Sequence, residues 1–69
     1  MNDYEKINIF KWLWTMEVFY QNQYIDKLNN FMRHNEHGFL DYLSIYESEM
    51  KLKYFKEFSR DICLILREK

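Results

Sequence analysis

The chain has 69 residues, of which ten are Lys or Arg, eleven are Asp or Glu, and 20% are aromatic. This length predicts one domain, spanning 1–69, whose small core needs tight packing or self-association for stability. The near-balanced charge argues against a general nucleic-acid binder and against an acidic mimic of DNA. The single cysteine excludes a disulfide within the chain and favours a reducing, intracellular setting.

The sequence also bears on the cellular setting. No run approaches the roughly 20 apolar residues of a membrane span, and the N-terminal MNDYEK lacks the regions of an export signal. We therefore expect a cytoplasmic protein without membrane contact. The residue types that AT-rich codons encode are abundant, which suggests a low-GC bacterium, a phage or another mobile element; these types are Asn, Lys, Tyr, Ile and Phe.

The first predicted helix covers about 3–34. Asn2 followed by Glu5 is similar to a capping box, with Asn in place of Ser or Thr. Apolar residues then recur mostly at spacings of three, four or seven, which is the helical period. We expect the second helix to cover this main stripe, which consists of Tyr4, Ile7, Phe10, Trp14, Val18, Ile25, Leu28 and Met32.

The first half of this helix carries further apolar residues outside the main stripe. A helix that is apolar on two sides is normally covered on both, and one neighbouring helix covers only one of them. A small domain often covers such a side by dimerising or with a third helix. The functional interpretation is a docking surface for a different protein, since aromatic residues and Met are enriched in interface cores. The polar face is not Lys-rich, which argues against a membrane surface. The second stripe comprises Ile9, Trp12, Met16, Phe19 and Tyr20.

The segment RHNEHGF, residues 33–39, is the one clear break in the helical pattern. Gly38 suits the left-handed conformation that ends a helix, and His34 and His37 then lie near a helix C-terminus, where positive charge is favoured. We place the turn at 35–38. The QNQ segment, residues 21–23, contains a poor helix former and leaves open a break that would give a three-helix bundle.

The second predicted helix covers about 39–67. Its apolar spacing averages about 3.67 residues, which predicts a helix that is straight or slightly right-handed in its supercoil rather than a heptad coiled coil. The segment SIYE, residues 44–47, matches a capping box and offers a later start as an alternative. The apolar stripe consists of Leu43, Tyr46, Met50, Tyr54, Phe58, Ile62 and Ile65.

These elements predict an all-α fold of two long antiparallel helices, a helical hairpin. Each helix of about 30 residues would be about 45 Å long. A single hairpin of that length encloses no core, so we expect two hairpins to pair into a dimeric four-helix bundle.

Catalytic chemistry finds little support in the sequence. The HNEH segment, residues 34–37, offers two imidazoles but lacks the further ligands of a zinc site. Cys63 has apolar neighbours and lies far from both histidines, so it lacks the base that activates a thiol. Glu47, Glu57 and Asp61 flank the apolar stripe. We expect no metal, no cofactor and no enzymatic activity.

The segment KLKYFKEFSR, residues 51–60, combines basic and aromatic residues as a nucleic-acid-binding surface does. At helical spacing its aromatic residues face the core and its basic residues face water. The leading hypothesis is therefore a non-enzymatic regulator or inhibitor that occludes or scaffolds a protein partner through the second stripe. The alternative is a nucleic-acid-binding dimer that uses Lys51, Lys53, Lys56 and Arg60.

Overall fold

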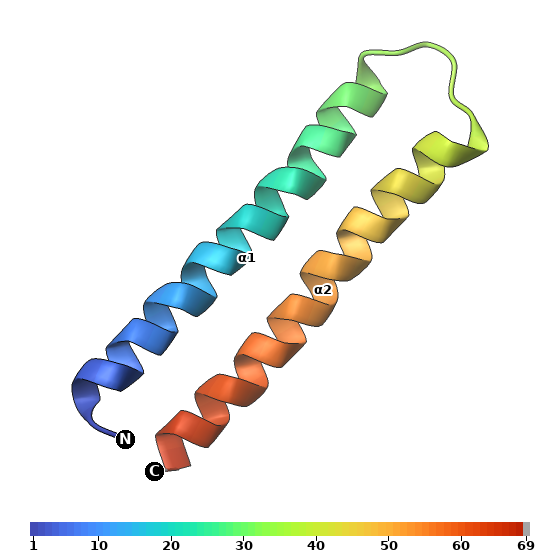
Figure 1. Cartoon of the computed structure of the whole chain (residues 1–69). Helices are drawn as coiled ribbons and strands as arrows, with labels where there is room; N and C mark the ends of the chain where they lie inside the picture. The colour runs from blue at the N-terminus through green and yellow to red at the C-terminus, as the bar shows by residue number, and fades with distance from the viewer. Residues whose placement is uncertain (69) are drawn as a thin grey trace.

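A computed structural model describes residues 1–68 of the chain. It contains two helices, α1 (Asp3–Met32) and α2 (Phe39–Glu68), which run antiparallel so that both termini lie at one end (Figure 1). The predicted helical hairpin is confirmed. Its extents of 52 × 16 × 11 Å describe a single layer of two helices, one beside the other.

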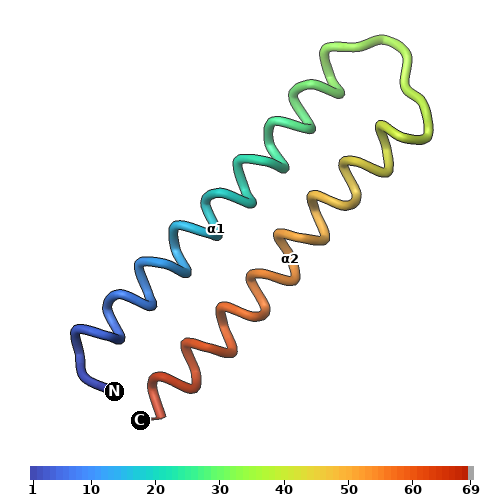
Figure 2. Tube along the Cα trace, in the orientation of Figure 1, coloured from blue at the N-terminus to red at the C-terminus, as the bar shows by residue number. Residues whose placement is uncertain are grey.

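The start of α1 is capped as the sequence predicts. The Glu5 backbone N–H donates a hydrogen bond to Oδ1 of Asn2, at 2.8 Å, which satisfies one of the free donors of the first turn. The helix then continues through 21–23 (Figure 2). The three-helix alternative is therefore wrong, because the modest helix propensity of Asn22 costs only about 0.7 kcal/mol while Tyr20 and Tyr24 pack half-buried on either side.

Gly38 begins α2 rather than ending α1. It does not adopt a positive φ, so the predicted left-handed helix end is wrong. Instead, the Gly38 N–H donates to Oδ2 of Asp41 at 2.9 Å, and the Asp41 N–H donates back to the Gly38 carbonyl at 3.1 Å. The carboxylate of Asp41 on the Gly38 N–H is one half of a capping box, because Gly38 has no side chain to supply the other half. α2 starts at Phe39, which excludes the later start at 44–47.

The turn is closed by stacked rings. α1 ends at Met32, two residues earlier than predicted, and Arg33 forms its C-cap. The His37 ring stacks on Phe31 with a centroid distance of 3.6 Å and an interplanar angle of 13°. Tyr42 of α2 meets the same Phe31 ring edge-on at 5.1 Å. His37 is therefore held between the Phe31 ring in the last turn of α1 and Tyr42 in the first turn of α2.

α1 turns a different side toward α2 than the main stripe predicts. Trp14 is 68% exposed and Ile7 is 51% exposed, whereas Leu13 is 3% exposed. The expectation that α2 covers the main stripe is therefore wrong. Periodicity shows which residues share a side but not where the neighbouring helix lies. The side that is buried depends on how the side chains of both helices fit together at their contact. The buried and half-buried apolar residues on the side toward α2 are Ile9, Leu13, Met16, Tyr20, Tyr24 and Phe31.

α2 also presents a different side from the predicted one. Tyr46 and Tyr54 of the predicted stripe are 58% and 63% exposed. Each step of four residues advances about 40° beyond a full turn, so a stripe of fours winds away from its neighbour. The residues that face α1 are spaced alternately three and four positions apart, which is the heptad pattern that keeps one side of a helix against a partner helix. The predicted average spacing of about 3.67 residues is therefore wrong for this side. Its buried and half-buried residues are Ile45, Ser48, Leu52, Phe55, Ser59, Ile62 and Leu66.

The seam between the helices differs along its length. In the terminal half, residues 3–20 and 52–68, Leu13 and Leu66 are 3% and 5% exposed and form the buried core. In the turn half, residues 21–51, the buried residue is Ser48, whose hydroxyl donates to the Ser44 carbonyl at 3.0 Å. Lys27 Nζ donates to Ser44 Oγ across the helices at 2.6 Å. The hairpin is therefore held by apolar packing in the terminal half, and by the Lys27–Ser44 hydrogen bond and the stacked rings of the turn in the other half.

Candidate protein-binding surfaces

The structure divides the predicted partner-binding residues between the seam and the surface. Trp12 and Phe19 are 53% and 50% exposed. The other three lie half-buried on the side toward α2, so they contribute first to the hairpin itself. These three residues are Ile9, Met16 and Tyr20.

A cluster of aromatic rings surrounds Phe55 of α2. Its ring centroid lies 6.2 Å from Trp12 in an edge-on arrangement and 5.2 Å from Tyr20. Phe58 lies one turn away on α2 at 6.0 Å. Edge-to-face and tilted ring pairs add about 0.5–1.5 kcal/mol beyond the burial of their area. These contacts hold the exposed Trp12 and Phe58 rings in place before any partner arrives.

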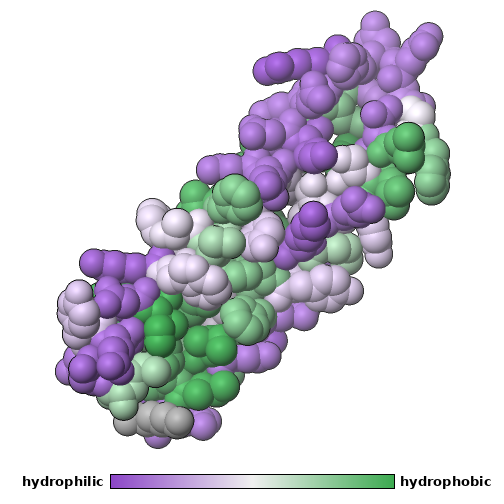
Figure 3. Space-filling view, viewed as in Figure 1, coloured by the Kyte–Doolittle hydropathy of each residue, from purple (hydrophilic) through white to green (hydrophobic). Residues whose placement is uncertain are grey.

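The cluster extends along both helices into one surface. Phe19 follows Trp12 by seven residues and Ile65 follows Phe58 by seven, so each pair shares a side of its helix. Figure 3 shows hydrophobic residues of both helices gathered over the terminal half. Phe58 and Ile65 are 48% and 49% exposed, whereas their spacing assigned them to the core stripe of the second helix. Their separation of seven residues was the signal in the sequence that they share a side of the helix. We call this surface the aromatic patch; it comprises Trp12, Phe19, Phe55, Phe58 and Ile65.

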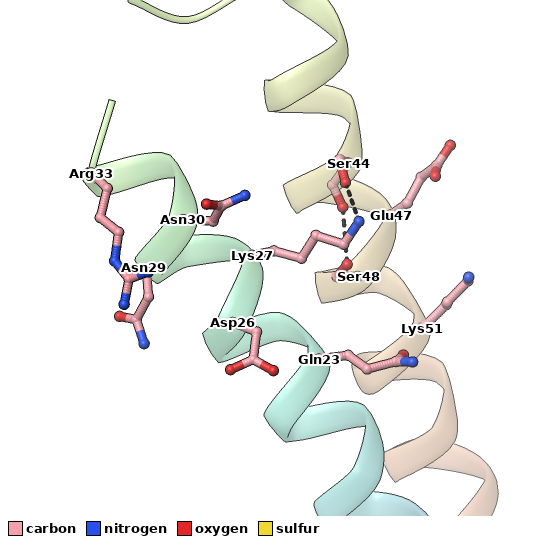
Figure 4. A pocket seen from close by; sticks show the side chains of 10 residues that line it. All are labelled: Gln23, Asp26, Lys27, Asn29, Asn30, Arg33, Ser44, Glu47, Ser48 and Lys51. Atoms are coloured by element: carbon pink, nitrogen blue, oxygen red, sulfur yellow. Dashed lines mark hydrogen bonds between the residues drawn. The ribbon is translucent and has the colours of Figure 1, made fainter. Parts of the chain in front are cut away.

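A polar groove of about 620 Å³ lies between the helices in the turn half. Its walls carry both charge signs, and Lys27 reaches across it toward Ser44 and Ser48 (Figure 4). The small serine side chains leave the space that larger residues would fill. The groove therefore offers hydrogen-bond donors and acceptors rather than an apolar pocket. It is lined by Gln23, Asp26, Lys27, Asn29, Asn30, Arg33, Ser44, Glu47, Ser48 and Lys51.

A second apolar surface follows α1 away from α2. Tyr4, Ile7 and Trp14 are 73%, 51% and 68% exposed. Trp12 and Trp14 are two residues apart, about 200° around the helix, so this surface and the aromatic patch lie on different sides of α1. We call it the outer stripe; it comprises Tyr4, Ile7, Lys11, Trp14, Val18, Gln21, Ile25, Leu28 and Met32.

The four basic residues predicted for nucleic-acid contact form two groups. Lys51 lines the polar groove. Lys53, Lys56 and Arg60 are exposed and share a side of α2 by their spacing of three and four. Lys51 and Lys53 are two positions apart in the sequence, which places them about 200° apart around the helix. Three of the four predicted basic residues therefore share one surface, and Lys51 lies on a different side of α2.

The candidates for chemistry lie apart from one another. Within residues 1–68, no group of three or more His, Cys, Asp or Glu side chains is placed to hold a metal ion. His34 and His37 line a small pocket of about 150 Å³ at the turn. Cys63 is a free, half-buried thiol in α2. Glu47, Glu57 and Asp61 are exposed.

No protein-family model, curated protein or solved structure gives a significant match to this chain. Among residues 1–68, neither helix has a stretch long and apolar enough to cross a membrane. Function is therefore inferred from the exposed surfaces of the hairpin.

Proposed function

We propose that the protein is a non-enzymatic interaction module that regulates or inhibits a protein partner by covering part of its surface. The observation that supports this most directly is the aromatic patch. Trp12, Phe19 and Phe58 remain about half exposed although each of them contacts another aromatic ring. Large exposed apolar patches on small proteins mark interaction sites.

The residue types of the patch suit a binding surface. Aromatic residues, Trp and Phe among them, are enriched in the buried cores of protein interfaces. Phe55 contacts both Trp12 and Phe58, so the partner meets rings that are already ordered. Immobilising a mobile side chain on binding costs about 0.5–1.5 kcal/mol. Side chains that are already ordered avoid most of this cost.

The shape of the patch favours an amphipathic helix as the partner segment. Trp12 and Phe19 on α1 face the same solvent side as Phe58 and Ile65 on α2, and each pair extends about 10 Å along its helix. A helix laid over the seam would place its apolar side between these pairs, as in helix-in-groove recognition. Its polar continuation would reach the groove around Lys27, where donors and acceptors are present.

A charge-introducing double variant tests the proposal. Phe19→Glu combined with Phe58→Glu leaves the seam residues intact, so we expect unchanged helicity by circular dichroism. Proteins captured by the tagged wild-type chain from a low-GC bacterial lysate should be lost with this variant. The matched control is Tyr46→Glu, which changes an exposed aromatic residue of the turn half and should leave capture unchanged. Equal capture by the double variant would place the binding surface elsewhere.

The nucleic-acid alternative has one supporting observation, the shared side of Lys53, Lys56 and Arg60. A protein that binds phosphates through these residues loses affinity steeply as salt rises. Replacing all three by Glu should then abolish binding to a mixed RNA or DNA probe. Binding to neither probe at low salt would remove this alternative and leave protein recognition.

A further inference from the structure

The hairpin exposes more surface than a folded chain of its mass normally does. Its accessible surface is 5834 Å², whereas folded monomers of 8.8 kDa expose about 4,800 Å². Its radius of gyration is 16.0 Å, against about 11 Å for a compact domain of this length. The excess of about 1,000 Å² is close to the roughly 800 Å² that each partner buries in a standard interface. The area available thus matches that of a stable dimer.

The outer stripe of α1 has the spacing of a helix–helix interface. Its nine positions alternate steps of three and four from Tyr4 to Met32, the heptad pattern of a coiled coil. All nine are exposed or half-buried in the single hairpin. Seven of them are apolar or aromatic. The two polar positions are Lys11 and Gln21.

These two polar positions select one arrangement of two copies. In a parallel pair, equal positions meet, so Lys11 would face the partner's Lys11 with like charges in a desolvated seam. In an antiparallel pair whose two-fold axis passes at the height of residue 16, Lys11 instead lies level with the partner's Gln21. The Gln side-chain oxygen accepts hydrogen bonds from an ammonium group. Because the interface is two-fold symmetric, it contains two such pairs of Lys11 and the partner's Gln21.

The same register matches the apolar positions. Trp14 lies level with the partner's Val18, and Ile7 lies level with the partner's Ile25. Residues 3–29 of the two α1 helices overlap, which is nearly the whole length of α1 (Asp3–Met32). A shift by one heptad in either direction would set Lys11 beside an apolar residue, the partner's Trp14 or Leu28, and leave its charge without a partner.

We propose that a second copy of this chain packs antiparallel on the outer stripe, with α1 against α1 and each α2 on the outside. Lys11 and Gln21 determine the register. The aromatic patch lies on a different side of α1 and stays free in this dimer, so the inference goes beyond the proposed function and does not depend on it.

The sign of one substitution distinguishes this arrangement from the parallel one. Gln21→Glu would place a carboxylate beside the partner's Lys11, so we expect dimers of the full chain about tenfold tighter at low salt by sedimentation equilibrium. In a parallel pair the same change would bring two carboxylates together and weaken the dimer. Gln21→Lys should weaken the dimer about tenfold in the antiparallel arrangement. Adding Lys11→Glu to Gln21→Lys restores opposite charges and should recover the affinity.

A variant at the centre of the stripe tests the surface itself. Trp14→Glu should raise the dimer dissociation constant about thirtyfold or more while circular dichroism at low concentration shows unchanged helicity, since Trp14 is 68% exposed in the hairpin. Tyr46→Glu is the control and should dimerise like the wild-type chain. A wild-type chain that stays monomeric at millimolar concentration, or a Gln21→Glu chain that dimerises more weakly, would overturn the proposal.

Discussion

The two halves of the hairpin use the same helices but different chemistry between them. In the terminal half, Leu13 and Leu66 form the buried core and rings gather around Phe55. In the turn half, the seam contains Ser48 and a Lys27–Ser44 hydrogen bond beside a polar groove. Apolar burial contributes about 25 cal/mol for each Å² removed from water, whereas a side-chain hydrogen bond contributes about 1 kcal/mol net. The free ends of the helices are therefore held more firmly than the segments nearest the connection.

The largest expected effect comes from the core of the terminal half. Leu13→Ala removes a nearly fully buried side chain and should lower the free energy of unfolding by about 2–3 kcal/mol. Urea denaturation followed by circular dichroism measures this change. The adjacent Trp14→Ala, at low protein concentration, is the control and should stay within about 0.5 kcal/mol of the wild-type chain because Trp14 is exposed in the hairpin. Equal losses for both variants would mean that the two sides of α1 are buried alike.

Hydrogen exchange compares the two halves directly. Backbone amides of residues 13–20 should exchange about tenfold more slowly than those of residues 24–31, because opening the terminal half exposes more apolar surface. Nuclear magnetic resonance resolves both sets within the same helix, so α1 serves as its own control. Faster exchange in residues 13–20 would show that the turn, rather than the apolar core, limits opening.

The start of α2 should contribute a smaller amount. Asp41→Asn weakens the acceptor of the Gly38 N–H and removes a negative charge from the first turn, so we expect a loss of about 0.5–1 kcal/mol. Chemical denaturation measures it. Glu49→Gln removes the same charge from an exposed position in the middle of α2 and should be nearly neutral. A neutral Asp41→Asn variant would mean that stacked rings alone position the turn.

The smallest effect is expected in the polar seam, and it has the opposite sign. Ser48→Ala should stabilise the hairpin by about 0.5 kcal/mol, because Ala has the higher helix propensity. The lost hydroxyl bonds only to the carbonyl of its own helix at Ser44, and that carbonyl already has a helical partner. Thermal unfolding detects the shift. A destabilised Ser48→Ala variant would show that the hydroxyl itself stabilises the contact between the helices.

Much of the local structure could be predicted from the sequence. Asn2 caps α1, α2 begins at Phe39, and the lack of proline predicts two long helices. These features depend on residues within a few positions of one another. Gly38 was misassigned because a glycine suits both a helix end and a helix start, and the side chain of Asp41 decides between them.

The candidate sites were only half predictable, because apolar periodicity on α1 marks two stripes of similar character. Trp12 and Phe19 were correctly placed among residues outside the main stripe. Phe58 and Ile65 were taken for core, and Ser48 and Ser59 were not recognised as seam residues because they are polar. A small side chain can lie in a seam as readily as a large apolar one when the opposing residue fills the space.

The sequence by itself determined that this chain forms two capped helices with a turn between them, since hydrogen bonds and propensities act over three or four residues. Only the tertiary structure decided which stripe each helix buries. One hairpin can cover one stripe of α1, and the stripe with Leu13 at its centre packs against α2 while the stripe with Trp14 stays exposed. That choice depends on how side chains of both helices fit together at one spacing, which no single stretch of sequence contains.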